Sequence, residues 1–468
     1  SHRPRPPVVA FVCVACCRRA LTQRGATRTA VPPGGRGMPC SVSGAAPKQD
    51  CASLPRPRLY LYPECIGTPP WQAADSARLN WLWLALRKSE YRVTDGACAD
   101  FFFLSNYRSA TKSSERVATL LNKVAAAYPY WNATSRRHLI LMPCDHGPGD
   151  CMWKRNRAVF TGVPDAANGL PGAAMPFSSP SRRSLGFVTY NGDPGRWNVF
   201  APGLDVRLPS HEMHECGPFC GLHRLPPKAR LAALRRHSPW YDGRMPAQRS
   251  SREGACASAA ASGAWLSAPR RIELFFAGRI PKGGPRGDVF RHHHARERFV
   301  LIDSAHERTS SRRVSAASDA LLPNRSNRAD WFPAAMADSE FCLSPLGTNE
   351  GDSDRFLPAL LYGCIPVFSL ADEARPFEEV VPWDSCSLRV HETDLPRLHT
   401  ILASISRAQR ASMRRAMCGV WPAMLWTRLG FASSRPRGEG YLGESGRADA
   451  LATFMAVLRR RVEADAST

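Results

Sequence analysis

Short apolar runs alternate with helix-length segments along most of this chain, and this alternation constrains the fold more than any other feature. Residues 59–62 and 101–104 have the length and composition of buried strands, and residues 75–88 between them carry apolar side chains at helical spacing. A third strand is expected at 138–142, just before Pro143. Strands that alternate with helices pair in parallel through right-handed crossovers, so residues 56–210 are predicted to form an α/β domain with helices on both faces.

A second series of strands and helices follows and predicts a second α/β domain over residues 269–415. Its strands are expected at 271–276, 341–344 and 365–368, with a helix at 356–362 in spite of Pro358. The first of these strands ends at Ala277-Gly278, and a glycine there lets backbone N–H groups approach an anion. Residues 416–468 are predicted to be a C-terminal segment that ends in a docking helix, because residues 448–462 place four apolar residues on one helical face.

Two segments lack these patterns. Residues 1–55 are rich in Pro, Arg, Gly and Ser and are predicted to be a stem or a disordered segment. Residues 211–268 are rich in Ala, Ser, Arg, Pro and Gly and are predicted to be a low-complexity insertion or linker between the domains.

Composition places the chain among globular proteins, because 44% of its 468 residues are hydrophobic and 22% are charged. Its net charge of +23 comes from 63 basic and 40 acidic residues, and only seven of the basic residues are lysine. A surface rich in arginine suits nucleic acid, an anionic polysaccharide or a nucleotide diphosphate. The arginines are scattered along the chain, however, which is also typical of a biased base composition in the gene.

The cysteines and apolar runs say little about the compartment. Sixteen cysteines are many for a cytosolic enzyme, but they do not form a dense framework, and Cys144–Cys151 or Cys342–Cys364 could pair in an oxidising lumen. Two glycosylation sequons begin at Asn132 and Asn324. No run approaches the roughly 20 apolar residues that span a bilayer; the best candidate, residues 8–17, could be the end of a signal or anchor.

The strongest local pattern lies in the second predicted domain. Ser339-Glu340-Phe341-Cys342-Leu343-Ser344-Pro345-Leu346-Gly347 leads to Ser353-Asp354-Arg355-Phe356, and then to Gly363-Cys364-Ile365-Pro366-Val367 and Pro376-Phe377. This run resembles the carboxyl-terminal signature of the exostosin (GT47-type) glycosyltransferases in order and spacing over about 45 residues. Weaker likenesses are Tyr128-Pro129-Tyr130-Trp131-Asn132, Pro143-Cys144-Asp145-His146-Gly147 and the basic loop around Arg286, so the resemblance extends over roughly residues 58–462.

The resemblance implies a GT-B-like α/β fold, with two Rossmann-like domains that face each other across a cleft, the donor on the second and the acceptor against the first. It implies sugar transfer from a nucleotide sugar, expected to be UDP-linked, to a glycan or glycoprotein acceptor, without a metal or other cofactor. A leaving nucleotide diphosphate is an anion, and arginines with helix-start N–H groups stabilise such a charge. The expected donor-binding residues are Gly278, Arg286, Gly347, Ser353 and Arg355.

An inverting transfer needs a general base that takes the proton of the acceptor hydroxyl, and Asp145 and His146 are the candidates on the first domain. Residence in the Golgi lumen or membrane, and assembly with itself or with another glycosyltransferase, are further expectations from the family.

Two departures from the family pattern leave an alternative open. Pro358 stands where the family usually carries an acid that accepts hydrogen bonds from the ribose, and Cys144 stands where histidine is common. These residues favour a catalytically inactive relative that acts as the partner or scaffold of an active enzyme. A basic polymer-binding protein is a third possibility, although no nucleic-acid-binding module is recognised and nucleic acid is not expected as a partner.

Three motifs suggest metal sites, but each has a simpler interpretation. Asp352-Ser353-Asp354 has the form of a metal-binding D-x-D motif, yet it overlaps the donor motif and is interpreted as a solvated loop. His292-His293-His294 is interpreted as a polar helix face. The spacing of the remaining set fits no standard zinc finger, and its members are His211, His214, Cys216, Cys220 and His223.

Overall fold

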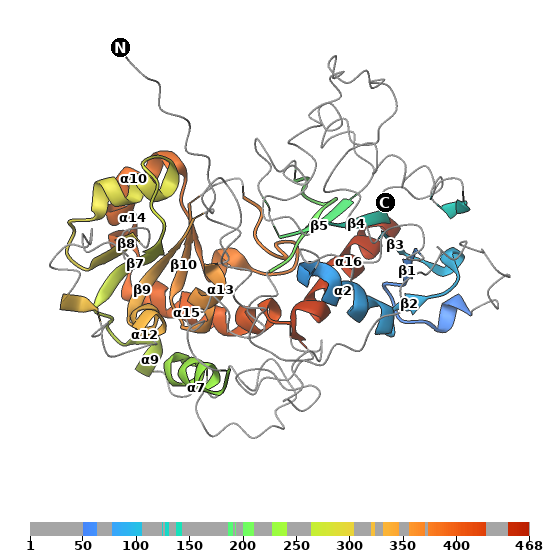
Figure 1. The fold of residues 1–468 in the computed structure, drawn as a ribbon, viewed down its shortest axis with the longest axis horizontal. Helices are drawn as coiled ribbons and strands as arrows, with labels where there is room; N and C mark the ends of the chain where they lie inside the picture. Colours follow the sequence, from blue (N-terminus) through green and yellow to red (C-terminus); the bar gives the residue numbers. More distant parts are fainter. Residues whose placement is uncertain are drawn as a thin grey trace, which may run out of the picture. The chain divides into compact units, whose positions relative to one another are not determined.

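The structure, a computed structural model, describes the residues that build two parallel sheets and the helices beside them (Figure 1). These residues are 50–62, 77–104, 124, 127–130, 137–142, 186–190, 192, 200–209, 227–240, 264–303, 320–322, 331–345, 355–369, 373–426 and 448–467. All of them belong to one unit, Ser43–Thr468.

The first sheet has six parallel strands in the order β2-β1-β3-β4-β5-β6. The strands predicted at 59–62, 101–104 and 138–142 are confirmed, while the other three are too short or too weakly patterned for sequence analysis to find. Beside this sheet lies the predicted helix α2 (Ala77–Lys88). The strands are β1 (Leu59–Leu61), β2 (Arg92–Val93), β3 (Phe101–Leu104), β4 (His138–Met142), β5 (Gly186–Thr189) and β6 (Val206–Arg207).

The second sheet has five parallel strands in the order β11-β10-β9-β7-β8. The strands predicted at 271–276, 341–344 and 365–368 are confirmed, and β8 and β11 are additions. Strands β8, β9 and β10 are buried along their whole length, as expected for a parallel sheet covered on both faces. The strands are β7 (Ile272–Gly278), β8 (Phe299–Asp303), β9 (Ser339–Ser344), β10 (Ile365–Phe368) and β11 (Leu388–Arg389).

Helices cover the second sheet on both faces. Figure 1 shows α12 beside β7 and β9, α13 beside β9 and β10, and α15 beside β10. The predicted helix at 356–362 is confirmed as α13. The helices of this part are α7 (Pro227–His237), α9 (Ala264–Ser267), α10 (Gly284–His293), α12 (Trp331–Ala337), α13 (Phe356–Leu361), α14 (Leu398–Ser404) and α15 (Arg407–Val420), with 3-10 turns η9 (Trp383–Ser385), η10 (Glu392–Arg397) and η11 (Trp421–Met424).

Residues 227–240 pack against α12 and α13, although they fall within the segment predicted as an insertion. Ser238 Oγ donates to the carbonyl of Leu361 at 2.7 Å, and Trp240 Nε1 donates to the carbonyl of Leu360 at 2.8 Å. The Trp240 ring stacks on Trp421, with 6.2 Å between their centroids. These contacts fasten α7 to the carboxyl end of α13. The domain boundaries themselves stay predictions.

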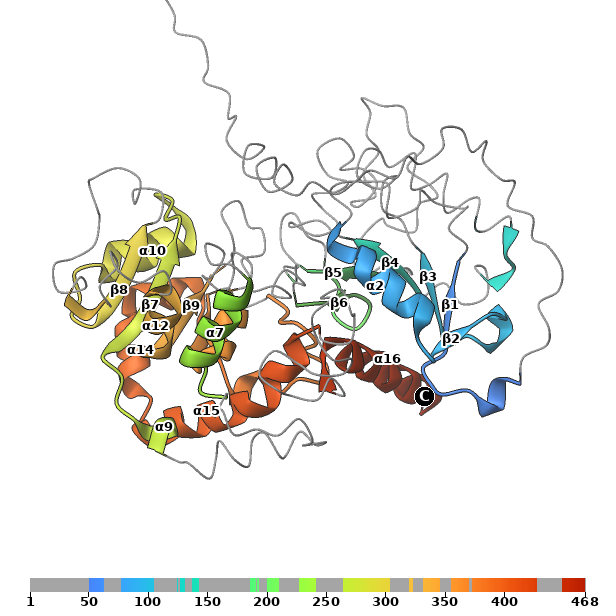
Figure 2. The ribbon, with the colours of Figure 1, turned by 60° about the horizontal axis from the view of Figure 1, so that its bottom comes forward.

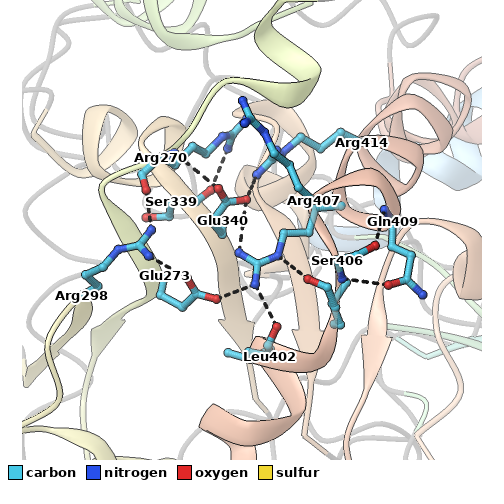
Figure 3. A network of polar contacts seen from close by, with 12 residues as sticks. Arg270, Glu273, Arg298, Ser339, Glu340, Leu402, Ser406, Arg407, Gln409 and Arg414 are labelled. Carbon is cyan, nitrogen blue, oxygen red and sulfur yellow. Dashed lines mark hydrogen bonds and ion pairs between the residues drawn. The ribbon is translucent and has the colours of Figure 1, made fainter.

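A buried charge network at the amino ends of β7 and β9 attaches α15 to the second sheet (Figure 3). Glu340 accepts a hydrogen bond from Arg414, and both side chains are almost fully buried. Arg410 lies 2.9 Å from Glu273 and stacks over Phe341, with 4.9 Å to the ring centroid. A capping box at Ser406 and Gln409 starts the helix. The network therefore fixes the end of the sheet opposite to the strand ends where ligands bind in α/β folds.

The C-terminal helix α16 (Ala450–Ala466) returns to the first sheet (Figure 2). Its Phe454 packs edge to face against Phe103 of β3, with 6.0 Å between the centroids. Arg461 donates to the carbonyls of Leu204 and Asp205 at 2.9 Å and 2.7 Å. A helix is thus present at the end of the chain, and it begins at an N-cap aspartate, Asp449.

Two disulfides lie among the described residues. Cys342 on β9 pairs with Cys364, which directly precedes β10. This is one of the two pairs that the sequence suggested. Cys51 pairs with Cys98, joining η1 (Cys51–Ser53) to η5 (Gly96–Cys98), and sequence analysis did not propose this pair. The other proposed pair, Cys144–Cys151, and both sequons lie outside the described residues.

Within the described part of the chain, no helix is both long enough and apolar enough to cross a membrane.

Candidate functional site

Three of the predicted donor-binding residues meet at the carboxyl edge of the second sheet. Gly278 is the last residue of β7, Arg286 lies in the first turn of α10, and Arg355 directly precedes α13. The carboxyl ends of parallel strands gather the loops and helix starts that bind ligands in such folds. The fold therefore brings Gly278 and Arg355, which are 77 positions apart in the sequence, to the same edge of the sheet.

Arg355 is held against the end of β7 by its guanidinium. Its Nη2 donates to the carbonyl of Ala277 at 3.2 Å, and its Cζ lies 5.1 Å from the centroid of the Phe276 ring. A cation over an aromatic face is attracted by the negative potential of the ring. The guanidinium is thus oriented at the strand end rather than extended into solvent.

Arg286 approaches the same ring from α10. Its Cζ lies 5.6 Å from the Phe276 centroid, and its Nη1 donates to the carbonyl of Arg279 at 3.3 Å. The side chain is buried, and this burial, together with the nearby charge of Arg355, lowers the pKa of Arg286 to about 9. Two guanidinium groups this close repel each other, so an anion that binds both would relieve the repulsion.

Gly278 leaves the space that the guanidinium of Arg355 occupies. A Cβ atom at this position would clash with Nη2 of Arg355 and lie 3.0 Å from the Phe276 ring. The close approach explains, in packing terms, why the strand that carries Phe276 ends in glycine. This role differs from the backbone approach to an anion that sequence analysis assigned to Gly278.

The start of α10 adds backbone donors next to Arg286. Gly283 is the N-cap and makes no side-chain cap bond, and Gly284 has φ of +75°, a left-handed conformation that favours glycine. The first N–H groups of a helix have no partners within the helix, and the helix dipole makes this end positive. Both features suit an anion beside the two arginines.

Asp303 is a residue of this edge that sequence analysis missed. It ends β8, is 7% exposed, and accepts a hydrogen bond from the backbone N–H of Ile280 at 3.2 Å. The bond fixes the chain that leads from β7 into α10. A buried aspartate at the end of a predicted strand would have been the signal, but the strand at 299–303 was itself not predicted.

Pro358 is accommodated because α13 begins at Phe356. It is the third residue of the helix, within the first turn, where the backbone N–H has no intrahelical partner to lose. Its carbonyl still accepts a hydrogen bond from Tyr362 at 3.0 Å. The helix therefore tolerates the proline, although proline supplies no carboxylate for a ribose.

Several predicted residues lie outside the described part of the chain. They are the candidate bases Asp145 and His146, the donor-loop residues Gly347 and Ser353, the D-x-D residues Asp352 and Asp354, and the possible zinc ligands His211, His214, Cys216, Cys220 and His223. Among the described residues, no group of three or more His, Cys, Asp or Glu side chains is placed to hold a metal ion.

The histidine run on α10 divides between surface and core. His292 and His294 are exposed, whereas His293 is 1% exposed and its Nε2 lies 2.8 Å from the carbonyl of Leu395. Burial is the main cause that lowers the pKa of His293. The interpretation as a polar helix face thus fits two of the three residues, and the third attaches α10 to η10.

Comparison with known proteins shows a family likeness in the part of the chain that carries this edge. Residues 239–405 match the model of the exostosin GT47 domain. This part of the chain is similar to exostosin GT47 domains. Strands β7 to β11, α10, α13 and the three clustered residues Gly278, Arg286 and Arg355 all lie within the match.

Individual proteins that are similar to part of this chain include plant proteins. A protein of rice (Oryza sativa subsp. japonica) named as a probable glucuronosyltransferase is 42% identical over 97 residues, which cover 19% of this chain and 22% of that protein. Another rice protein that is also named as a probable glucuronosyltransferase is 37% identical over 118 residues, covering 22% of this chain and 28% of that protein. A probable beta-1,4-xylosyltransferase of Arabidopsis thaliana is 42% identical over 92 residues, covering 18% and 22%. The match therefore spans about a quarter of each relative's length.

Proposed function

We propose that this protein is a glycosyltransferase that binds a nucleotide sugar at the carboxyl edge of the second sheet and transfers the sugar to a glycan. The observation that carries the proposal is the pair Arg286 and Arg355, both docked on Phe276 at strand ends of a GT47 domain. The names of the relatives, glucuronosyltransferase and xylosyltransferase, support the reaction class. They also make UDP-glucuronic acid and UDP-xylose the first donors to test.

The two guanidinium groups would act on the diphosphate. As the bond from the sugar to the diphosphate breaks, negative charge grows on the leaving phosphate oxygen. Arg286, Arg355 and the first N–H groups of α10 would stabilise this charge more strongly in the transition state than in the bound donor. We propose that these groups replace the divalent cation on which other glycosyltransferases rely.

The acceptor side is proposed from the family resemblance. In a GT-B arrangement the first sheet would face the donor edge across a cleft and present the acceptor. Asp145 or His146 would remove the proton of the attacking hydroxyl, and attack from the face opposite the diphosphate would invert the anomeric centre. The disulfides Cys51–Cys98 and Cys342–Cys364 support an oxidising compartment such as the Golgi lumen.

A turnover assay tests the proposal. Purified protein is incubated with UDP-glucuronic acid or UDP-xylose and with short β-1,4-linked xylose oligomers, and product formation is followed by mass spectrometry with and without EDTA. We expect transfer from one donor, insensitive to EDTA and reduced at least 100-fold in Arg355→Ala. Arg291→Ala is the matched control, because Arg291 is exposed on the same helix α10 and pairs with Asp288 at 2.9 Å.

The alternative of an inactive relative predicts a different outcome. Pro358 supplies no acid for the ribose, which is the observation that favours this alternative. If the folded protein binds no donor and transfers no sugar, the enzyme hypothesis is rejected in favour of an inactive partner or scaffold.

A further inference from the structure

Arg207 of β6 is a buried cation that no motif singled out. Its side chain is 2% exposed. Nη1 lies 2.5 Å from Glu373 Oε1 and donates to the carbonyl of Ala374 at 2.6 Å, and Nε donates to the carbonyl of Tyr190 at 3.0 Å. Glu373 is equally buried, at 3%.

These bonds belong to a joint between the edge of the first sheet and the segment that follows β10. The backbone N–H of Ala374 donates to the carbonyl of Gly192 at 2.9 Å, and that of Phe377 donates to the carbonyl of Arg207 at 3.1 Å. Gly192 admits no side chain, since a Cβ there would overlap the carbonyl oxygen of Ala374. The segment 373–377 is thus held to β6 by backbone and side-chain bonds together.

The guanidinium of Arg207 also reaches the start of α13. Its Cζ lies 5.8 Å from the centroid of the Phe356 ring. Phe356 is 1% exposed and directly follows Arg355 in the chain. Its ring packs against Phe368 and Trp383, with centroids 5.9 Å and 5.6 Å away.

The first turn of α13 is therefore bound by two cation–aromatic contacts that involve successive residues. Arg355 lies on Phe276 of β7, and Phe356 lies beneath Arg207 of β6. A shift at Phe356 would be passed to Arg355 through the backbone they share.

We infer that Arg207 is a positioning residue for the donor arginine Arg355, acting from the first sheet through Phe356 and Glu373. The inference rests on the proposed function, in which Arg355 binds the diphosphate. A planar guanidinium suits the position, because it bonds in several directions in its plane while its face rests on a ring. Lysine would keep the charge and lose this geometry.

The test compares two paired substitutions that remove buried or half-buried charges at the same joint. Arg207→Met combined with Glu373→Gln removes both charges of this ion pair, so neither of the two is left buried without the other. Arg461→Met with Glu379→Gln is the matched control, because Arg461 bonds to Glu379 at 2.9 Å and to the carbonyls of Leu204 and Asp205, all of which lie outside α13. Arg207→Lys is measured beside them.

Two quantities are measured on each folded variant: the Kd for UDP by calorimetry, and hydrogen exchange of peptides that contain residues 355–362. We expect the Arg207 pair to raise the Kd at least tenfold and to speed exchange in α13, with Arg207→Lys between it and the unaltered protein. The control should change the Kd less than twofold and leave the exchange of α13 unaltered.

The inference is overturned if the Arg207 pair leaves both quantities unchanged, or if the control changes them equally. Should the unaltered protein bind neither UDP nor any UDP-sugar, the proposed function fails by itself. Exchange in α13 then still decides whether Arg207 positions this helix.

Discussion

At the scale of single residues, the ring of Phe276 organises the candidate site. It supports both guanidinium groups, at 5.6 Å from Arg286 and 5.1 Å from Arg355, while the neighbouring Gly278 leaves room for the second. The motifs in the sequence pointed to Gly278, Arg286 and Arg355. They gave Phe276 no role in the site, because its contacts join residues that lie far apart in the chain.

Gly278→Ala should weaken donor binding without unfolding the protein. The added methyl group meets the end of the flexible Arg355 side chain, so the guanidinium moves away rather than the backbone. Loss of one charge-assisted hydrogen bond, about 1.5–3 kcal/mol, corresponds to a roughly ten- to hundredfold higher Kd for UDP. Calorimetry and thermal unfolding check this, and a large fall in Tm with unchanged affinity would contradict it.

The affinity for UDP should fall as the pH rises above about 9. Burial and the charge of Arg355 lower the pKa of Arg286 to about 9, so its cation is fully present at neutral pH and is lost as the pH passes that value. Bound phosphate favours the protonated form, so proton uptake on binding should appear above pH 9. Titrations from pH 7 to 10 measure both effects, and the step should be absent from Arg286→Gln.

At the scale of elements, buried charges and a disulfide fasten the second sheet to its helices. Glu340 on β9 is the centre of the charge network, because Arg414 donates to it and the backbone N–H of Arg270 approaches it at 3.4 Å. Arg270 and Arg414 are 8% and 2% exposed. Sequence analysis placed Glu340 in a motif but could not see that α15 brings its partner from 74 residues away.

Glu340→Ala should destabilise the fold strongly. Removing the carboxylate leaves the buried guanidinium of Arg414 without its anion, and such a loss costs about 3–5 kcal/mol. Asp338→Ala serves as the control, because its partner Arg271 is 59% exposed and such pairs contribute roughly 0–1 kcal/mol. Denaturant unfolding measures both variants, and equal losses would show that the network contributes no more than a surface pair.

Removing the disulfide between β9 and β10 should also lower stability. Cys342 and Cys364 close a loop across adjacent strands, and loss of such a cross-link costs about 2–4 kcal/mol. The double change Cys342→Ala and Cys364→Ala is compared with Cys386→Ala, which removes a buried thiol that forms no cross-link. A loss no larger than that of the control in denaturant unfolding would count against the role of the bond.

At the scale of the whole molecule, the alternation of strands and helices predicted two parallel α/β sheets, and both are present. Strands β3 and β10 could be located because their apolar pattern is local, although β8, with a similar apolar run, was not predicted. The two-residue strands β2, β6 and β11 could not, because they are strands only through pairing with a neighbour. The role of Arg207 could not be predicted either, because it depends on contact with Glu373, which lies 166 residues further along the chain.

The most direct measurement of the central claim is calorimetric binding of UDP and UDP-sugars to the full chain, with Arg355→Ala and Arg291→Ala in parallel. The claim is that the carboxyl edge of the second sheet binds a nucleotide diphosphate through Arg286 and Arg355. It predicts saturable binding with a Kd that rises at least tenfold in Arg355→Ala and is unchanged in Arg291→Ala. Binding that survives Arg355→Ala unchanged, or no binding by the folded protein, would contradict it.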